Sequence, residues 1–321
     1  MVLGVERPRL QRHPDGVTAV DTEYVRPGLA ASHIIEHEGR AAFVDTGTTH
    51  SVPLLLAALD ELGLARDAVD YVILTHVHLD HAGGAGRLMQ ALPQARAVLH
   101  PRGAPHMIDP SKLIAGSMAV YGEARYRELY GELVPIPSER VVTTQDGQRL
   151  SLAGRPLEFV HTPGHALHHQ VIVDLEHRSL FTGDTFGLSY RELDTEQGAF
   201  IVPTTTPTQF DPEQLIASVD RLLGYAPQAL YLTHYSRVTD VPRLAELLKL
   251  QIHEFVKIAR SHRAEANRFN AISADMRALW LELLRRHGCT LTEARIDEVL
   301  GTDLELNTQG LIAWLDRERK G

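Results

Sequence analysis

The sequence has a single cysteine, Cys289, among its 321 residues. One cysteine cannot form a disulfide within the chain, and it cannot build the multi-cysteine sites of zinc fingers or iron–sulfur proteins. Any metal ion that this protein binds must therefore be held by histidine, aspartate or glutamate side chains.

Long apolar runs and an excess of positive charge are also missing. No stretch approaches the roughly 18 apolar residues that a membrane span needs, and residues 1–15 are interrupted by arginines and prolines. We therefore expect no signal peptide, no membrane association and a cytoplasmic location. Lys and Arg total 32 against 41 Asp and Glu, a formal net charge of -9, which disfavours binding to a phosphate backbone. The expected partner is a small-molecule substrate and not a nucleic acid.

The rest of the composition is that of a globular protein, with 44% hydrophobic and 23% charged residues. Over residues 16–236, short apolar runs alternate with turn residues and amphipathic stretches, which predicts a mixed α/β domain. Several strands come first, and strands and helices then intermix. This order favours helices packed on two sheets over a simple Rossmann alternation.

After residue 236 the pattern is helical only. Apolar residues recur at helical spacing over residues 244–258 and again over residues 272–284. Gly301 is expected to end one helix, and Asn307 is expected to cap the next.

Two domains follow from this change of pattern. We predict an α/β catalytic domain over residues 1–240 and an all-helical C-terminal extension over residues 241–321. Packing or homodimer formation is the expected role of the extension, and a wall of the substrate pocket is the alternative.

The 18 histidines are unusually numerous, and one short segment concentrates potential metal ligands. Within six residues the chain carries His76, His78, Asp80 and His81. They follow the apolar run Val72–Leu74, which predicts a strand. Side chains two apart in extended backbone point to the same side, while Asp80 and His81 enter the next turn and face a neighbouring point. The spacing predicts two adjacent metal ions. Gly83 and Gly84 follow, and their freedom of backbone angles is expected to let the chain pass close to the site.

Three later segments each place another potential ligand after a predicted strand. One strand leads through the turn Pro163-Gly164 to His165, another ends at Asp184, and a third ends at His234. Strand ends on one edge of a sheet sandwich converge on a shared cleft. We therefore expect these three side chains to meet the first cluster.

These segments, together with Val44-Asp45-Thr46-Gly47, resemble the metallo-β-lactamase fold superfamily, which includes glyoxalase II, lactonases, ribonuclease Z and flavodiiron proteins. The resemblance covers residues 16–236 and implies a four-layer αββα sandwich. It implies two divalent metal ions, with zinc expected and iron or manganese as alternatives. The implied ligands are His76, His78 and His165 for one ion, Asp80, His81 and His234 for the other, and Asp184 as the bridge. Asp45 would orient the ligand loop, since ligand imidazoles need an outer partner.

The resemblance also implies hydrolysis. Two divalent ions, two aspartates and a bridging hydroxide leave the cluster with a charge of about +1, which keeps water deprotonated near neutral pH and stabilises an oxyanion. Asp80, beside the nucleophile, would accept or return a proton as a catalytic residue. We expect cleavage of an ester, thioester or lactone by the bridging hydroxide, as in glyoxalase II or lactonases. Tyr190 and Arg191, in the loop after Asp184, are candidate substrate contacts, with a structural role as the alternative.

Differences from individual members of the superfamily narrow the range of expected activities. The chain keeps Asp80, whereas true β-lactamases replace one ligand of the second metal, and it keeps His78, where flavodiiron proteins have glutamate. Glyoxalase II enzymes continue after the bridging aspartate with Gly-Cys-Gly-Arg, whereas this chain has Gly187-Leu188-Ser189-Tyr190-Arg191. A glutathione thioester is therefore not the specific expectation. The alternatives are an iron-dependent oxygen-using enzyme of the same fold, persulfide dioxygenase-like or diiron, and a non-enzymatic binding protein stabilised by metal.

Overall fold

The computed structural model describes residues 7–206 and 208–319, so the outermost residues of the two predicted domains lie outside the described part. The chain forms two compact units. Unit 1 comprises Met1–His161, His168–Gly183 and Thr233–Ser236, and unit 2 comprises Thr162–Leu167, Asp184–Leu232 and Arg237–Gly321. Among the described helices, none is both long enough and apolar enough to cross a membrane.

The first sheet of unit 1 has its strands in chain order. They are β1 (Leu10–Arg12), β2 (Val17–Asp21), β3 (Ala31–His37), β4 (Arg40–Val44), β5 (Val69–Ile73), β6 (Arg96–Leu99) and β7 (Val141–Thr143). Strands β1 to β4 are antiparallel, and β4 to β7 are parallel. Glu38 and Gly39 join β3 to β4 with φ of 48° and 71°, the left-handed pair of a tight hairpin turn that matches the strand twist.

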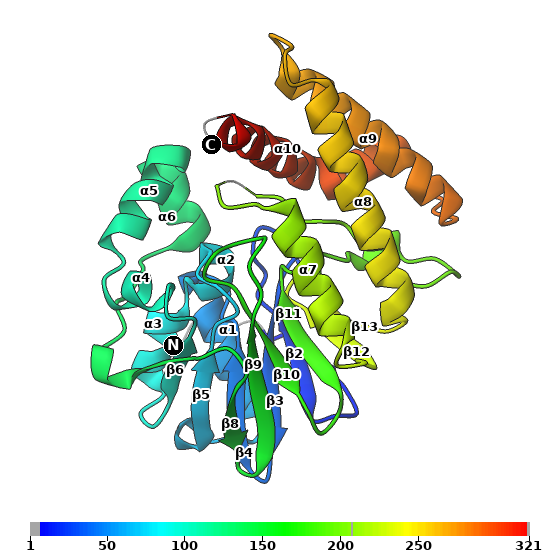
Figure 1. The fold of residues 1–321 in the computed structure, drawn as a ribbon. Helices are drawn as coiled ribbons and strands as arrows, with labels where there is room; N and C mark the ends of the chain where they lie inside the picture. Colours follow the sequence, from blue (N-terminus) through cyan, green and yellow to red (C-terminus); the bar gives the residue numbers. More distant parts are fainter. Residues whose placement is uncertain (1–6, 207, 320–321) are drawn as a thin grey trace. The chain divides into compact units, whose positions relative to one another are not determined.

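Helices cross over between the parallel strands, as parallel pairing requires. Helix α1 (Val52–Leu62) joins β4 to β5, and the short α2 (Leu79–Ala82) and α3 (Ala85–Ala91) join β5 to β6 (Figure 1). Leu55 and Leu59 of α1 lie in one buried cluster with Phe43 and Val72 of the sheet. This core fixes the ends of β4 and β5, from which the candidate ligand loops leave.

Between β6 and β7 the chain forms three helices, α4 (Ala104–Ile108), α5 (Ser111–Tyr121) and α6 (Glu123–Tyr130). Helix α5 has no buried residue, but α6 buries Tyr126 and Tyr130. These tyrosines pack in a small cluster with Leu79 of α2 and with Tyr24. The cluster attaches α6 to the loops that follow β2 and β5.

Unit 1 also contains four strands of the second sheet. Their order is β11 (Ser179–Gly183), β10 (Gln170–Asp174), β9 (Arg155–His161) and β8 (Gln148–Leu152), all antiparallel to their neighbours. Two sheets with helices confirm the predicted α/β class. Arg155 of β9 and Asp174 of β10 are almost fully buried and form an ion pair at 2.5 Å, which removes the cost of burying either charge alone.

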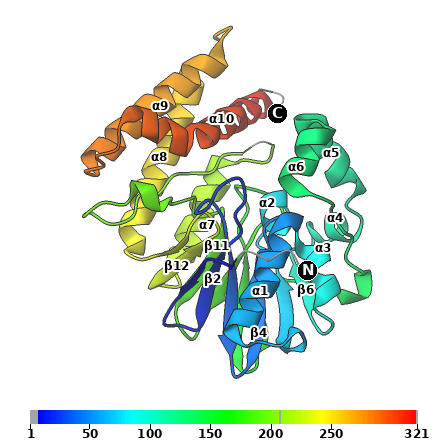
Figure 2. The ribbon, with the colours of Figure 1, turned by 180° about the vertical axis from the view of Figure 1, so that it is seen from behind.

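Unit 2 is mainly helical (Figure 2). Its elements are α7 (Pro212–Leu223), β12 (Ala229–Leu232), most of β13 (Ser236–Val238), α8 (Val241–Ser261), α9 (Arg268–Arg286) and α10 (Glu293–Glu318). Phe255 of α8 and Trp280 of α9 lie with ring centroids 5.8 Å apart. The helices predicted from apolar periodicity over residues 244–258 and 272–284 are confirmed.

The prediction of a helix break in the tail was wrong. Helix α10 continues from Glu293 to Glu318 through both Gly301 and Asn307. Asn307 does not cap a helix; its side-chain nitrogen donates to Pro203 O at 2.9 Å, and its side-chain oxygen accepts from the backbone N of Thr205. The side-chain amide of Asn307, which the sequence predicted to cap a helix, therefore bonds to the buried backbone of Pro203 and Thr205 instead.

Candidate metal centre

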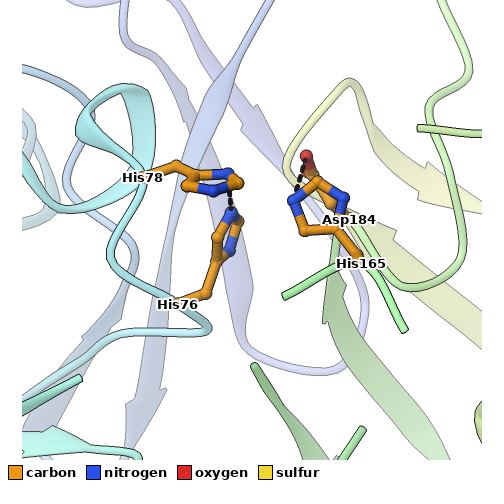
Figure 3. A group of neighbouring side chains, drawn as sticks. All are labelled: His76, His78, His165 and Asp184. Atoms are coloured by element: carbon orange, nitrogen blue, oxygen red, sulfur yellow. Dashed lines mark hydrogen bonds and ion pairs between the residues drawn. The ribbon is translucent and has the colours of Figure 1, made fainter. Parts of the chain in front are cut away.

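The segment after β5 arranges its four candidate ligands as the spacing predicted. His76 and His78 lie next to each other, with His76 Nε2 2.9 Å from His78 Nδ1 (Figure 3). His78 is the N-cap residue of α2, with φ −64° and ψ 147°, so the chain turns there and carries Asp80 and His81 on the helix. His76 and His81 are buried, whereas His78 and Asp80 are partly exposed. Two histidines therefore precede the turn, and an aspartate and a histidine follow it.

Gly83 and Gly84 do let the chain pass close to its neighbours, but the expected reason was wrong. Neither glycine has positive φ, at −58° and −82°. A Cβ on Gly84 would lie 2.6 Å from Thr48 O, and one on Gly83 would lie 2.4 Å from Leu79 O. Lack of space for a side chain, and not backbone freedom, requires glycine here.

Asp45 is the hub of hydrogen bonds behind this loop. The residue is fully buried and has φ of 57°. Its carboxylate accepts from the backbone N of Thr75 at 2.8 Å, from the hydroxyls of Thr75 and Thr233 at 2.8 Å each, and from His81 Nδ1 at 2.9 Å. The contact with Nδ1 leaves Nε2 of His81 to face Asp80.

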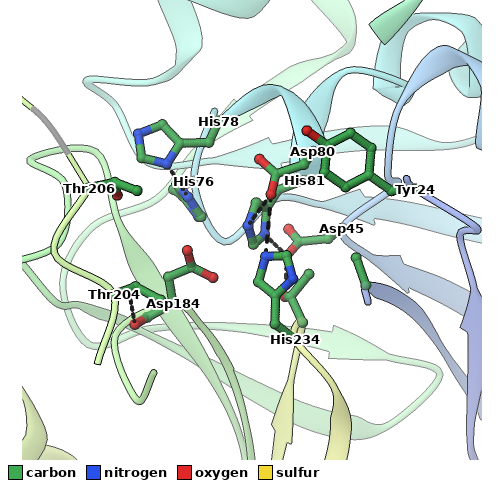
Figure 4. Close-up of polar contacts among 12 residues, drawn as sticks. Tyr24, Asp45, His76, His78, Asp80, His81, Asp184, Thr204, Thr206 and His234 are labelled. Atoms are coloured by element: carbon green, nitrogen blue, oxygen red, sulfur yellow. Dashed lines mark hydrogen bonds and ion pairs between the residues drawn. The ribbon is translucent and has the colours of Figure 1, made fainter. Parts of the chain in front are cut away.

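Asp80, His81 and His234 form a cluster suited to a metal ion, within unit 1 (Figure 4). One ligand atom from each lies within 4.8 Å of the others. His81 Nε2 is 3.6 Å and His234 Nε2 is 3.3 Å from Asp80 Oδ2. His234 Nδ1 contacts Leu29 O at 2.8 Å, which sets the tautomer that offers Nε2. Neutral imidazoles with outer partners and a nearby carboxylate suit a divalent transition metal.

Unit 2 carries the other two predicted ligands, His165 and Asp184. His165 Nε2 lies 3.5 Å from Asp184 Oδ2 (Figure 3). Thr204 contacts both residues, because its hydroxyl lies 3.1 Å from His165 Nδ1 and donates to Asp184 O at 3.0 Å. Gly164, at φ 131°, precedes His165, and a Cβ there would lie 2.3 Å from Leu215 N. The predicted Pro-Gly turn is thus needed to bring the chain over the start of α7.

Sequence reasoning missed the threonines that support these ligands. Thr75 and Thr233 both donate to Asp45, and each stands in the tripeptide Leu-Thr-His, at residues 74–76 and 232–234. The repeated tripeptide was a signal that could have found them. Thr204 stands in a threonine-rich stretch and had no comparable signal.

Tyr24 was also missed. It lies in the loop between β2 and β3, close to Asp80 (Figure 4), and its hydroxyl is 3.3 Å from that of Tyr130. Burial, followed by the charge of Asp80, raises the pKa of Tyr24 well above its usual range, so the phenol stays a hydrogen-bond donor at neutral pH. A pocket of about 340 Å³ adjoins the ring, and Thr22, Thr48, Arg125 and Leu129 help to line it.

The two candidate substrate contacts are held within unit 2. Tyr190 is buried, and its hydroxyl lies 3.3 Å from Asp303 Oδ1 of α10. Arg191 pairs with Asp194 at 3.2 Å and donates to Ser189 O at 2.7 Å. These contacts give both residues a structural role, and a contact with substrate stays a prediction.

The chain belongs to the metallo-beta-lactamase superfamily, whose family model matches residues 25–234. The matched range contains every one of the predicted ligands. With the two sheets, their helices and the C-terminal helices, the protein has the metallo-β-lactamase fold.

Individual relatives agree with this assignment. The chain is 27% identical over 225 residues to the metallo-beta-lactamase fold-containing protein ST1585 of Sulfurisphaera tokodaii, covering 68% of this chain and 77% of that protein. The ST1585 crystal structure superposes with a TM-score of 0.65 at 21% identity, over 93% of this chain and 99% of that one.

Two further relatives differ in their named chemistry. A hydroxyacylglutathione hydrolase of Aeromonas hydrophila is 33% identical over 153 residues, which span 47% of this chain but only 44% of that enzyme. The chemotaxis sensor ODP, solved as a peroxy diiron species, shares the fold with a TM-score of 0.52 at 14% identity, over 76% of this chain and 94% of that one.

Proposed function

We propose that this protein is a binuclear metallohydrolase that cleaves an ester, thioester or lactone. The observation that carries the proposal is the Asp80, His81 and His234 cluster, with Asp45 behind it, in a chain of the metallo-β-lactamase superfamily. A site with carboxylate and imidazole donors and second-layer hydrogen bonds matches the donor set of hydrolytic zinc enzymes.

The proposed ligands divide between two ions. Asp80, His81 and His234 hold one ion, and His76, His78 and His165 hold the other, with Asp184 shared. This full set rests on the superfamily motif, and the local geometry of each unit supports it through the His76–His78 and His165–Asp184 contacts. Zinc is the proposed metal.

When bound, the two ions lower the pKa of water to near neutrality and polarise the carbonyl of the substrate. Residues of this chain transfer the proton and hold the ligand histidines in position. Asp80, partly exposed beside His234, accepts the proton of the attacking water and returns it to the leaving group. Asp45 keeps His81 in one tautomer throughout, and Thr204 does the same for His165.

The pocket beside Tyr24 is proposed to receive the acyl part of the substrate. Burial, the larger cause of the raised pKa of Tyr24, favours the protonated phenol, which can donate a hydrogen bond to a carbonyl oxygen that enters from this side. The pocket carries two acidic residues, Glu23 and Glu128, against one arginine, Arg125, which is paired with Glu128 at 2.8 Å. This balance favours a neutral acyl group over an anionic glutathione conjugate.

The deciding experiment is metal analysis of protein purified without added metal or chelator, followed by a panel of neutral esters, thioesters and lactones with S-lactoylglutathione as the anionic comparison. We expect two zinc ions per chain and turnover of a neutral substrate. One iron per chain, with oxygen consumed and no hydrolysis, would contradict the proposal and favour the oxygen-using alternative.

A further inference from the structure

Unit 2 contains a pocket that includes none of the proposed metal ligands. Its volume is about 210 Å³, and its walls come from two segments, residues 191–199 and residues 237–243. Three arginines and two aspartates line it: Arg191, Arg237, Arg243, Asp194 and Asp240. The chain as a whole is acidic, so three guanidinium groups around one small pocket are a local exception.

Two of the arginines already have a carboxylate partner. Arg191 lies 3.2 Å from Asp194, and Arg243 lies 2.6 Å from Asp240. Backbone carbonyls also hold both guanidinium groups in place, at Ser189 for Arg191 and at Ala199 for Arg243. Their positive charges are therefore balanced and their positions fixed.

Arg237 is the exception. Among the described residues, the buried Nε of its guanidinium has no hydrogen-bond partner. A buried donor without a partner costs free energy, and a charged one costs more. With Asp194 and Asp240 already paired, the pocket keeps one surplus positive charge, from Arg237.

The wall formed by residues 195–198 is anchored by hydrogen bonds. Thr195 donates to His287 O at 2.7 Å, and Gln197 donates to Arg286 O at 3.2 Å, which ties the first segment to the end of α9. His287 Nε2 also contacts Gly198 O at 3.0 Å. A pocket with fixed walls keeps its shape without a ligand, and this lowers the entropic cost of binding.

We propose that this pocket binds a small oxyanion, a phosphate or carboxylate group, through Arg237, with Arg191 and Arg243 contributing further donors. A planar guanidinium pairs with such an oxyanion through two parallel hydrogen bonds. The volume lies below the range of roughly 300–1,000 Å³ that is typical of pockets for drug-sized ligands, so the ligand is a free anion or a small metabolite that carries one. Apart from Arg191, no residue of this site has a role in the proposed hydrolysis.

Titration calorimetry on the metal-loaded full chain tests the proposal, with inorganic phosphate and succinate as separate probes at constant ionic strength. We expect saturable binding of at least one probe and at least tenfold weaker binding by Arg237→Gln. Arg295→Gln is the matched control, because Arg295 is an exposed arginine of α10 that pairs with Glu298 outside the pocket. Since phosphate can also bind metal ions, the difference between wild type and Arg237→Gln is the readout.

The two probes separate the sources of the oxyanion. Binding of phosphate alone assigns a phosphate group, and binding of succinate alone assigns a carboxylate. Binding of neither probe, or equal affinity in wild type and Arg237→Gln, overturns the proposal.

A second variant keeps the test valid if Arg237→Gln unfolds. Thr239→Glu places a carboxylate on an exposed residue that lines the same pocket. We expect this variant to have a higher melting temperature than wild type without phosphate and to lose phosphate binding. An unchanged melting temperature with full phosphate binding would overturn the proposal.

Discussion

Asp45 and His81 form a fully buried pair in which the carboxylate accepts a hydrogen bond from Nδ1 at 2.9 Å. The two residues are 36 positions apart, and β4 and β5, which lead to them, are neighbours in the first sheet. The pair fixes which nitrogen of His81 is offered to the Asp80 and His234 cluster. The sheet register therefore determines the chemistry of one ligand.

Replacing Asp45 tests this relationship. Asp45→Asn puts an amide NH₂ group where a carboxylate oxygen accepts hydrogen bonds from Thr75, Thr233 and His81, so at least one donor loses its acceptor. We expect zinc affinity to fall about 10- to 100-fold, as for other outer partners of ligand histidines. Competition with a zinc chelator measures the change. Asp70→Asn, at an aspartate paired with Arg40 on the surface, is the control, and equal zinc affinity in both variants would contradict the assignment.

Asp184→Asn tests the shared ligand. The substitution keeps the size of the side chain and its neighbour His165, but it removes the negative charge that two ions would share. We expect one metal ion per chain in place of two, and a fall in kcat of about 100-fold or more. Elemental analysis and steady-state kinetics on the same preparation give both quantities. Two bound ions with wild-type turnover would show that Asp184 is not the bridge.

Tyr24→Phe tests the pocket beside the metal cluster. Loss of one neutral hydrogen bond to the substrate is expected to lower kcat/KM about three- to tenfold without changing the metal content. Tyr126→Phe is the matched control, because it removes a buried hydroxyl that has no partner among the described residues. We expect that control to leave kinetics unchanged. Equal kinetic effects of the two substitutions would place Tyr24 outside the substrate pocket.

His33 predicts a dependence of stability on pH. Burial, with a smaller effect of His13, lowers the pKa of His33 to about 3, whereas an unfolded histidine has a pKa near 6.5. Below about pH 6.5 only the unfolded chain binds this proton. The stability that neutral His33 contributes is thus present above pH 6.5 and declines by about 1.4 kcal/mol per pH unit as the pH falls towards 3.

Urea unfolding of metal-free protein between pH 8 and pH 5 measures this slope. His33→Gln is expected to flatten it relative to wild type, even if the variant is less stable at pH 8. His37→Gln, at the partly exposed end of the same strand, should keep the wild-type slope. Parallel curves for wild type and His33→Gln would exclude the buried histidine as the cause.

The candidate ligands could be picked out because each follows a predicted strand within a few residues, where strand ends and turn residues are visible in the sequence. The order of His76, His78, Asp80 and His81 around the turn at His78 is local, whereas the orientation of the His81 ring depends on the distant Asp45. The contact of Tyr24 with Tyr130 joins residues 106 positions apart and depends on how α6 packs, which local pattern does not encode. The predictions made from Gly301 and Asn307 were wrong for the same reason. The contacts of Asn307 are with distant residues, which a local pattern does not encode.

Some predictions stay open. The boundary at residue 240, the cytoplasmic location and a homodimer through the C-terminal helices stay predictions. The structure groups residues 184–232 with the helical tail in unit 2, and α7 contacts α8 there.

The contact between Asn307 and Thr205 connects the tail to His165, a candidate ligand. Asn307 holds the backbone on both sides of Thr204, through Pro203 O and Thr205 N, and Thr204 in turn contacts His165. Gly310 lies against the same segment, where a Cβ would overlap Thr205 O. If α10 helps His165 to hold a metal ion, thermodynamic reciprocity requires the ion to stabilise α10 by the same free energy. Metal loading would then slow amide hydrogen exchange at the far end of the chain, and the tail would report on the occupancy of the active centre.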